Sequence, residues 1–296
     1  IHNYDQTQAL SIAEASAFAD LDSHERLMER LEAAGILDRE VEVLPKPEEV
    51  RNRKAQGEGL TRPELAVLLA YAKITLFNEI IDSSIPDEAF LEKEAITYFP
   101  AGVQHYKDAI DSHRLKREII ATRLSNDIVN LGGITFVHRV KERAGVETEP
   151  VIRAFVAANE IFGLKDLFHD IDQLDYKIPS STQTRLRQDL INALRRQVFW
   201  LAKSKLDVTS ISEIVEQYQA GVKQLLSSGP GALSPFEQNL LNEWQQEYQT
   251  LGAPEEIAAR VANVCVMTSA TDIVESAQRC IFDSEFLKHG KTYYCR

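Results

Sequence analysis

Cysteine, glycine and proline are scarce in this chain of 296 residues. The three cysteines, Cys265, Cys280 and Cys295, lie far apart, form no CxxC pair for zinc and are too few for a disulfide-stabilised secreted scaffold. With only 13 glycines and 10 prolines, the composition favours long helices over a turn-rich β architecture. These scarcities indicate a helical protein of a reducing, cytoplasmic compartment.

Long apolar runs and an excess of basic charge are missing as well. The most apolar run, Leu65–Ala72, is far too short to cross a bilayer, and no signal peptide opens the chain. A formal net charge of −12 repels nucleic acid and anionic lipid, so we expect neither as a partner. The same charge opposes a weaker alternative, a helical nucleic-acid binder that uses Arg185, Arg187, Arg195 and Arg196.

The known signatures of catalytic and nucleotide sites are also missing. The sequence has no strand followed by a GxGxxG turn, no Walker loop, no GxSxG elbow and no HExxH motif. Gly132-Gly133 follows a helical pattern, and Gly229-Pro230-Gly231 lacks the further glycine of a phosphate-binding turn. We therefore expect no catalytic residue, no cofactor site and no metal site in this chain.

What is present is helical periodicity along almost the whole chain. It predicts an all-α fold of about a dozen helices, more than about 60% helical and without a significant sheet. The clearest helix begins at Thr61, which forms a capping box with Glu64, and its apolar stripes on two faces indicate the middle of a domain. Gly35 is expected to end the second helix in a left-handed conformation.

Four segments bear on how these helices are divided. Single helices are expected from about Val103 to Leu131 and from Pro254 to Arg279. Glu40–Pro45 has an extended alternative because Val41 and Val43 alternate with polar residues, and Ile134–Val140 has a strand alternative by propensity.

The best internal linker is Ser227–Gly231, with two serines and a Gly-Pro-Gly sequence. It predicts a main helical domain over residues 1–226 and further helices over 232–296. The first residue is not methionine and the last 16 residues have no convincing stop signal. Both ends are therefore expected to be cut ends, with the second group of helices truncated.

Several polar groups have both a functional and a structural interpretation. An acidic cluster with a histidine could hold a metal, but helical geometry favours a solvated face: His169, Asp170, Asp172 and Asp175. His105 and His113 lie two turns apart and favour ordinary surface or capping roles. The basic run His113, Arg114, Lys116, Arg117 and Arg123 could bind an anion, although interleaved acids favour neutralisation along the helix. Asn126 and Asn130, one turn apart among apolar residues, need hydrogen-bond partners.

Several long segments of this chain have a distinctive sequence: GEGLTRPELAVLLAYAK (57–73), YFP (98–100), HRLKREIIAT (113–122), NDIVNLGGITFVHR (126–139) and VIRAFVAANEIFGL (151–164). Together with NYDQTQALS and SHERLMERLEAAGILDREVEVLP, they resemble the C-terminal helical region of the large bacterial NAD-dependent glutamate dehydrogenases. The resemblance is strongest over residues 3–200. It implies that the parent enzyme oxidises L-glutamate to 2-oxoglutarate and ammonium with NAD, and that its catalytic lysine and glycine fingerprint precede Ile1.

The resemblance implies that this chain is a non-catalytic part, inactive alone, whose partners are the catalytic domain of the same polypeptide and other subunits of a homo-oligomer. We expect a polar surface near Gly132-Gly133 to dock that domain: Arg117, Arg123, Asn126, Asn130 and Arg139. The alternative is that these residues tie the helices of this chain to one another. A different alternative for the whole chain is a free-standing helical scaffold, which periodicity alone permits equally well.

Overall fold

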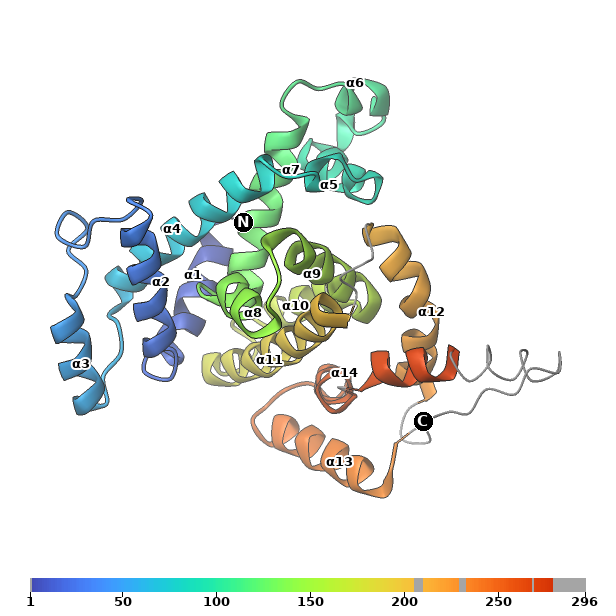
Figure 1. The fold of residues 1–296 in the computed structure, drawn as a ribbon. Helices are drawn as coiled ribbons and strands as arrows, with labels where there is room; N and C mark the ends of the chain where they lie inside the picture. Colours follow the sequence, from blue (N-terminus) through green and yellow to red (C-terminus); the bar gives the residue numbers. More distant parts are fainter. Residues whose placement is uncertain (1, 205–209, 229–232, 268, 279–296) are drawn as a thin grey trace, which may run out of the picture. The chain divides into compact units, whose positions relative to one another are not determined.

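The protein is built from helices. The structure, a computed structural model, describes residues 2–204, 210–228, 233–267 and 269–278, with no description of the side chains of residues 2–4. The fold is 78% helical, and no strand occurs in the described part of the chain (Figure 1). The expected all-α class is therefore confirmed.

Neither of the two segments with a strand alternative forms a strand. Ile134–Val140 runs into the helix α8, Phe136–Ala144, and Glu40–Pro45 forms turns in which Val43 has a φ of 53°. Gly35 follows α2, Leu21–Ala33, with a φ of 68°, as expected from its position after the helix.

Contacts between Cα atoms divide the chain into two compact units. Unit 1 comprises the residues up to Val156 together with Val198–Ile211, and unit 2 comprises Ala157–Gln197 together with the residues that follow Ile211. The helices α9, Thr148–Phe162, and α11, Ser180–Ser204, contribute to both units. The division into 1–226 and 232–296 stays a prediction, because it follows a linker of which residues 229–231 lie outside the described residues.

Unit 1 contains the N-terminal half of the chain. Its α-helices, with α2, α8 and α9 given above, are α1 (His2–Ala15), α3 (Pro47–Gln56), α4 (Arg62–Ile81), α5 (Glu92–Tyr98), α6 (Lys107–Asp111) and α7 (Lys116–Asp127). Short 3-10 turns lie at Ile85–Asp87, Ala89–Leu91 and Ala101–Val103. These short turns join the helices of one continuous core.

The helix α4 lies inside unit 1, against α1 and α7. Its predicted capping box is present, and the Glu64 carboxylate accepts a hydrogen bond from the Thr61 backbone N–H at 2.7 Å. One apolar stripe is buried as expected: Leu65, Leu68, Leu69, Leu76 and Ile80. The second face is only half-buried, since Ile74 is 55% exposed, so α4 has one core face rather than two.

The single helix predicted from Val103 to Leu131 is wrong. After the turn Ala101–Val103, the chain forms α6, leaves the helix around His113, and starts again as α7. The Nδ1 atom of His113 accepts a hydrogen bond from the backbone N–H of Leu115 at 3.2 Å, which stabilises this break. Beyond α7 the last turn widens into a π-helical segment, Ile128–Gly132 (η4), and Gly133 ends it with a φ of 100°.

Unit 2 is formed by α10 (Leu164–Asp172), most of α11, α12 (Ile211–Ser228), α13 (Pro235–Thr250), α14 (Glu255–Val266) and the helix Ala270–Gln278. The helices α13 and α14 lie side by side (Figure 1). Tyr248 of α13 is fully buried and donates a hydrogen bond to the Asp189 carboxylate at 3.0 Å. This bond joins α13 to α11 within the unit.

The single helix predicted from Pro254 to Arg279 is also wrong, because it breaks after Val266 and resumes at Ala270 with a bend of 57°. No helix of the described ranges is by itself long and apolar enough to cross a bilayer; only this bent pair meets that test, with both members counted together and by length and composition alone. Cys265 of α14 is buried and unpaired, whereas Cys280 and Cys295 lie outside the described residues.

Candidate functional site

The five side chains of the predicted docking surface lie on α7, η4 and α8 of unit 1. They do not form one cluster, because each side chain with a hydrogen bond or ion pair contacts a different neighbour. Arg117 donates to the carbonyl oxygens of Ile81 and Ser83, at 2.9 and 3.0 Å, and pairs with Asp87. These contacts tie the start of α7 to the end of α4.

Two other arginines of this surface also bind acids within unit 1. The Arg123 Nε donates to Glu94 of α5 at 3.0 Å, and Arg139 of α8 pairs with Asp20, just before α2, at 2.7 Å. Both side chains stay about one-third exposed, at 30% and 32%. These two contacts support the alternative in which the arginines are internal ties, while docking stays a prediction.

The two asparagines differ from each other. Asn126 donates to the carbonyl oxygen of Thr122, one turn earlier on its own helix, at 2.8 Å. The Oδ1 atom of Asn130 is buried and has no hydrogen-bond partner among the described residues. A buried acceptor without a donor is costly, so Asn130 is the member of the set whose environment the described chain leaves incomplete.

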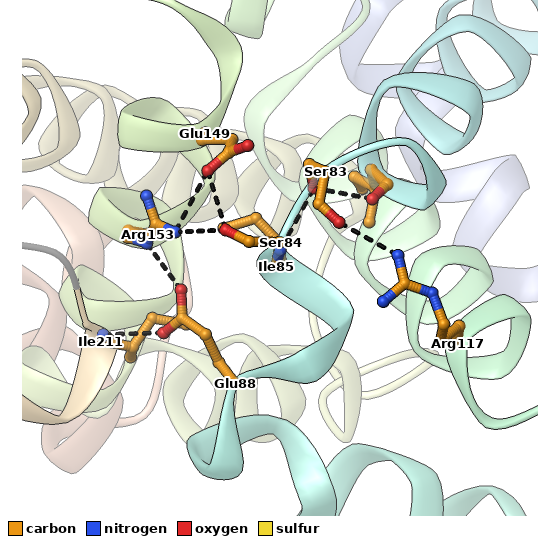
Figure 2. A network of polar contacts seen from close by, with 9 residues as sticks. Ser83, Ser84, Ile85, Glu88, Arg117, Glu149, Arg153 and Ile211 are labelled. Atoms are coloured by element: carbon orange, nitrogen blue, oxygen red, sulfur yellow. Dashed lines mark hydrogen bonds and ion pairs between the residues drawn. The ribbon is translucent and has the colours of Figure 1, made fainter.

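Arg117 belongs to a polar network around the loop that follows α4 (Figure 2). On the other side of that loop, Arg153 of α9 donates to Glu88 at 2.6 Å and to the Ser84 hydroxyl at 3.0 Å. The second Glu88 oxygen accepts from the backbone N–H of Ile211, the first residue of α12, at 2.9 Å. The network therefore joins the loop to α7, α9 and the start of α12, all within unit 1.

Two acids of the acidic cluster singled out by sequence also have partners inside the fold. Asp170 pairs with Arg260 at 2.6 Å, and Asp172 pairs with Arg187. In the described part of the chain, no group of three or more His, Cys, Asp or Glu side chains is gathered as a metal ion requires.

The two histidines and the basic run likewise have local contacts. His105 stacks on Tyr106 with ring centroids 3.9 Å apart, while His113 holds the break before α7. Lys116 of the basic run pairs with Asp111. Among the four arginines of the nucleic-acid alternative, Arg185 pairs with Asp189 at 2.7 Å. These contacts agree with structural roles for the groups concerned.

A cavity that the sequence did not indicate lies among α2, α4, η4 and α8 of unit 1, and we call it the α2–α8 cavity. Its volume is about 80 Å³ and its walls are mainly aliphatic. His138, which is 7% exposed, lines it, and neither ring nitrogen has a hydrogen-bond partner among the described residues. Burial first, and then the positive charge of Arg30, lowers the pKa of His138, so the ring is neutral at pH 7.

Sequence comparison identifies the family of this chain. The profile of the family described as "Glutamate dehydrogenase, C-terminal" matches residues 57–295. A protein of Pseudomonas aeruginosa named NAD-specific glutamate dehydrogenase is 38% identical over 280 residues, which are 93% of this chain and 17% of that protein.

Two further proteins with the same name show the same coverage. The protein of Halomonas elongata is 35% identical over 280 residues, and that of Mycobacterium tuberculosis is 30% identical over 273 residues; they cover 94% and 92% of this chain. The chain spans 17% of the length of each of these relatives. The resemblance found in the sequence is thus confirmed, and the chain belongs to the glutamate dehydrogenase family, as a match to its C-terminal region.

Proposed function

We propose that this chain is the non-catalytic helical region of an NAD-dependent glutamate dehydrogenase. The whole polypeptide would convert L-glutamate to 2-oxoglutarate and ammonium while reducing NAD, in the cytoplasm. The observation that carries this proposal is the coverage: almost all of this chain aligns with proteins named NAD-specific glutamate dehydrogenase, yet it spans only 17% of their length. The chemistry then belongs to the remainder of the polypeptide, which includes the NAD site.

The contacts of unit 1 support a structural role for this region. The arginines that sequence alone offered as free binding groups hold acids and carbonyl oxygens of neighbouring helices, as Arg117, Arg123 and Arg139 do. These contacts hold the helices of unit 1 together, and a unit held together in this way can support an adjoining domain. The partners proposed are the catalytic domain of the same polypeptide and further copies in a homo-oligomer, without nucleic acid or membrane.

The docking surface proposed on unit 1 comprises Arg117, Arg123, Asn126, Asn130 and Arg139. Its arginines keep part of their surface exposed while paired, so each can add a hydrogen bond to a second domain without losing the first. Asn130 adds to this surface only through the exposed part of its side chain, because its Oδ1 atom is buried within unit 1.

The test compares the complete polypeptide that contains this chain with the 296-residue chain alone. NADH formation from NAD and L-glutamate is followed by absorbance, with D-glutamate in place of L-glutamate as the control. We expect turnover by the complete polypeptide and none by the isolated chain, because no nucleotide-binding turn was found in its sequence. Turnover by the isolated chain, or an inactive complete polypeptide, would overturn the proposal.

A further inference from the structure

We propose that the loop between α2 and α3 inserts Val41 and Val43 into an apolar pocket with a basic rim, on another domain of the same polypeptide. The loop comprises residues 38–45, and we call it the Val43 loop (Figure 1). The inference rests on the proposed function in one respect, that the complete polypeptide contains such a domain. The Val43 loop shares no residue with the docking surface proposed on α7, η4 and α8.

The Val43 loop presents two β-branched apolar side chains to the surface. Val41 is 73% exposed and Val43 is 81% exposed, the largest fractions among the exposed large apolar side chains described in unit 1. Leu44 and Pro45, which follow them, are buried and attach the loop to the core. The two valines therefore contribute little to the packing of unit 1.

Val43 also occupies a backbone position at which glycine is usual. Its φ of 53° is left-handed, and the Leu44 N–H donates to the Arg39 carbonyl oxygen at 2.9 Å, as in the turn that ends many helices. A β-branched residue costs free energy in this conformation. Because Val43 is mostly exposed, packing within the described chain offsets little of that cost. Burial of its side chain against a second domain would offset it.

Tyr176 in unit 2 is the other residue besides glycine with a positive φ in the described chain, and it too is exposed. Its turn carries no second exposed large apolar side chain, whereas the Val43 loop carries two. The pair of valines, together with the left-handed backbone, therefore singles out the Val43 loop.

Polar contacts with α2 hold the Val43 loop in one conformation. Arg39, which is 4% exposed, donates to Glu25 and Glu32 of α2 at 2.8 and 2.7 Å. It also donates to the carbonyl oxygen of Pro45 at 3.0 Å, so it joins both ends of the loop to α2. The valines are thus presented by a fixed backbone, which lowers the entropic cost of docking.

The charges around the valines indicate a basic partner. Residues 38–49 have a net charge of −3, and one of their two bases, Arg39, is buried and already paired. The Glu40 carboxylate pairs only with Lys46, at 3.8 Å and with both side chains exposed. Glu48 has no cation partner in the described chain. The exposed surface of this segment is therefore acidic and attracts a basic rim.

An open hollow of about 610 Å³ beside Val43 has room for a lysine or arginine side chain of the partner. Glu40 and Glu48 line it. Arg53 lines it too, but its guanidinium is paired with Glu64 at 2.7 Å. The carboxylates of the hollow that lack a close cation can therefore bind one from the partner.

The small size of the apolar contact favours a partner on the same polypeptide. A stable complex of separate proteins buries roughly 800 Å² on each partner, and two valine side chains supply only a fraction of that area. A tethered domain needs less, because its effective concentration is on the order of millimolar. This chain spans 17% of the length of its relatives, so most of such a polypeptide lies outside it and can supply the pocket.

The experiment uses the complete polypeptide with a photo-reactive diazirine amino acid at position 41. After irradiation we expect a cross-link within one polypeptide, from position 41 to a peptide outside these 296 residues. Its yield should fall by about half or more between about 0.05 and 0.5 M sodium chloride, because salt screens the attraction to a basic rim. A yield independent of salt contradicts the basic rim. No cross-link, cross-links confined to the 296 residues, or cross-links between two copies overturn the proposal.

Two matched variants test the role of Val43. Val43→Asn removes the apolar side chain but keeps the turn, because asparagine tolerates the left-handed conformation. It should lower the yield of the cross-link from position 41 by about half or more. Val103→Asn changes a valine of unit 1 that is 41% exposed and lies outside the Val43 loop, and it should leave the yield unchanged. Equal yields in the two variants, both folded by circular dichroism, would overturn the proposal.

NADH formation from L-glutamate is measured on the same samples, which separates this inference from the proposed function. A polypeptide that reduces NAD but gives no such cross-link overturns the role of the Val43 loop alone. An inactive polypeptide that gives the cross-link supports the role of the Val43 loop and counts against the proposed function.

Discussion

Burial sets the protonation of His24, a residue of α2 that is 3% exposed. Its pKa is lowered to about 4, mainly by desolvation, with Asp20 acting in the opposite direction and Arg139 adding a smaller lowering effect. The ion pair of Arg139 with Asp20 lies beside this ring, but the raising effect of Asp20 exceeds the lowering effect of Arg139, so burial is what holds His24 neutral.

The stability of the protein should depend on pH through His24. Above pH 6.5 the ring is neutral in both the folded and unfolded chains; between pH 6.5 and 4 only the unfolded chain takes up the proton. The contribution of the neutral His24 ring to the free energy of unfolding is therefore complete above pH 6.5. It is lost as the pH falls, by up to about 3 kcal/mol near pH 4. Urea unfolding across this range, followed by an α2 probe, should show a shallower decline in His24→Gln.

The exposed His105 provides the control for this measurement. His105→Gln should follow the unmodified protein, because substitution of an exposed side chain changes the free energy of unfolding little. An identical decline in His24→Gln and in the unmodified protein would show that other groups account for the acid sensitivity.

At the scale of elements, the loop between α3 and α4 passes very close to the end of α1. A Cβ atom at Gly59 would lie 2.4 Å from the carbonyl carbon of Ala17 and 2.6 Å from the nitrogen of Phe18. Both atoms belong to the backbone, so no side chain can rotate to make room. Gly59 is therefore required for the packing of this loop on the turn between α1 and α2.

The Gly59→Ala variant should lower the free energy of unfolding of unit 1 by about 1–3 kcal/mol, as overpacking of a close contact does. The matched control is Gly102→Ala, since a Cβ atom there meets nothing within 4 Å and the backbone is not left-handed. Its effect should stay within about 0.5 kcal/mol. Equal urea midpoints for the two variants would mean that the loop moves away at little cost.

At the scale of the whole molecule, the question is whether α7 and η4 are tied only to their neighbours in unit 1 or also dock a further domain. Arg123 and Asn130 separate these roles, because Arg123 has a buried acid as partner whereas the Asn130 oxygen has none in the described chain. Removing Arg123 leaves Glu94, which is 9% exposed, without this cation. Removing Asn130 takes away a buried oxygen that lacked a donor.

In the isolated chain, Arg123→Ala should lower the free energy of unfolding by about 1–3 kcal/mol, and Asn130→Ala should change it by less than about 0.5 kcal/mol. In the complete polypeptide, Asn130→Ala should lower the rate of NAD reduction or alter the assembly measured by light scattering, because the proposed docking contact is lost. If Asn130→Ala leaves both properties unchanged there, the docking surface lies elsewhere.

The sequence by itself determined the helical class, the start of α4 at Thr61 and the family. Each depends on neighbouring residues: periodicity over a few turns, a capping box that spans four residues, or an uninterrupted motif. It also singled out Asn126 and Asn130 as polar residues in an apolar stretch. It could not locate the break at His113, because ring nitrogens that accept from the backbone leave no periodic signal.

The tertiary structure decided the partners of the polar residues and the existence of the cavity. Arg139 donates a hydrogen bond to Asp20, which lies 119 positions away in the sequence, and no pattern within either segment predicts that pairing. The α2–α8 cavity likewise arises where three helices and a π turn fail to fill the space between them, so Thr75 and His138 carried no sequence signal beyond ordinary helical positions. Local order follows from propensity and capping, whereas contacts and empty space depend on how side chains distant in the sequence pack together.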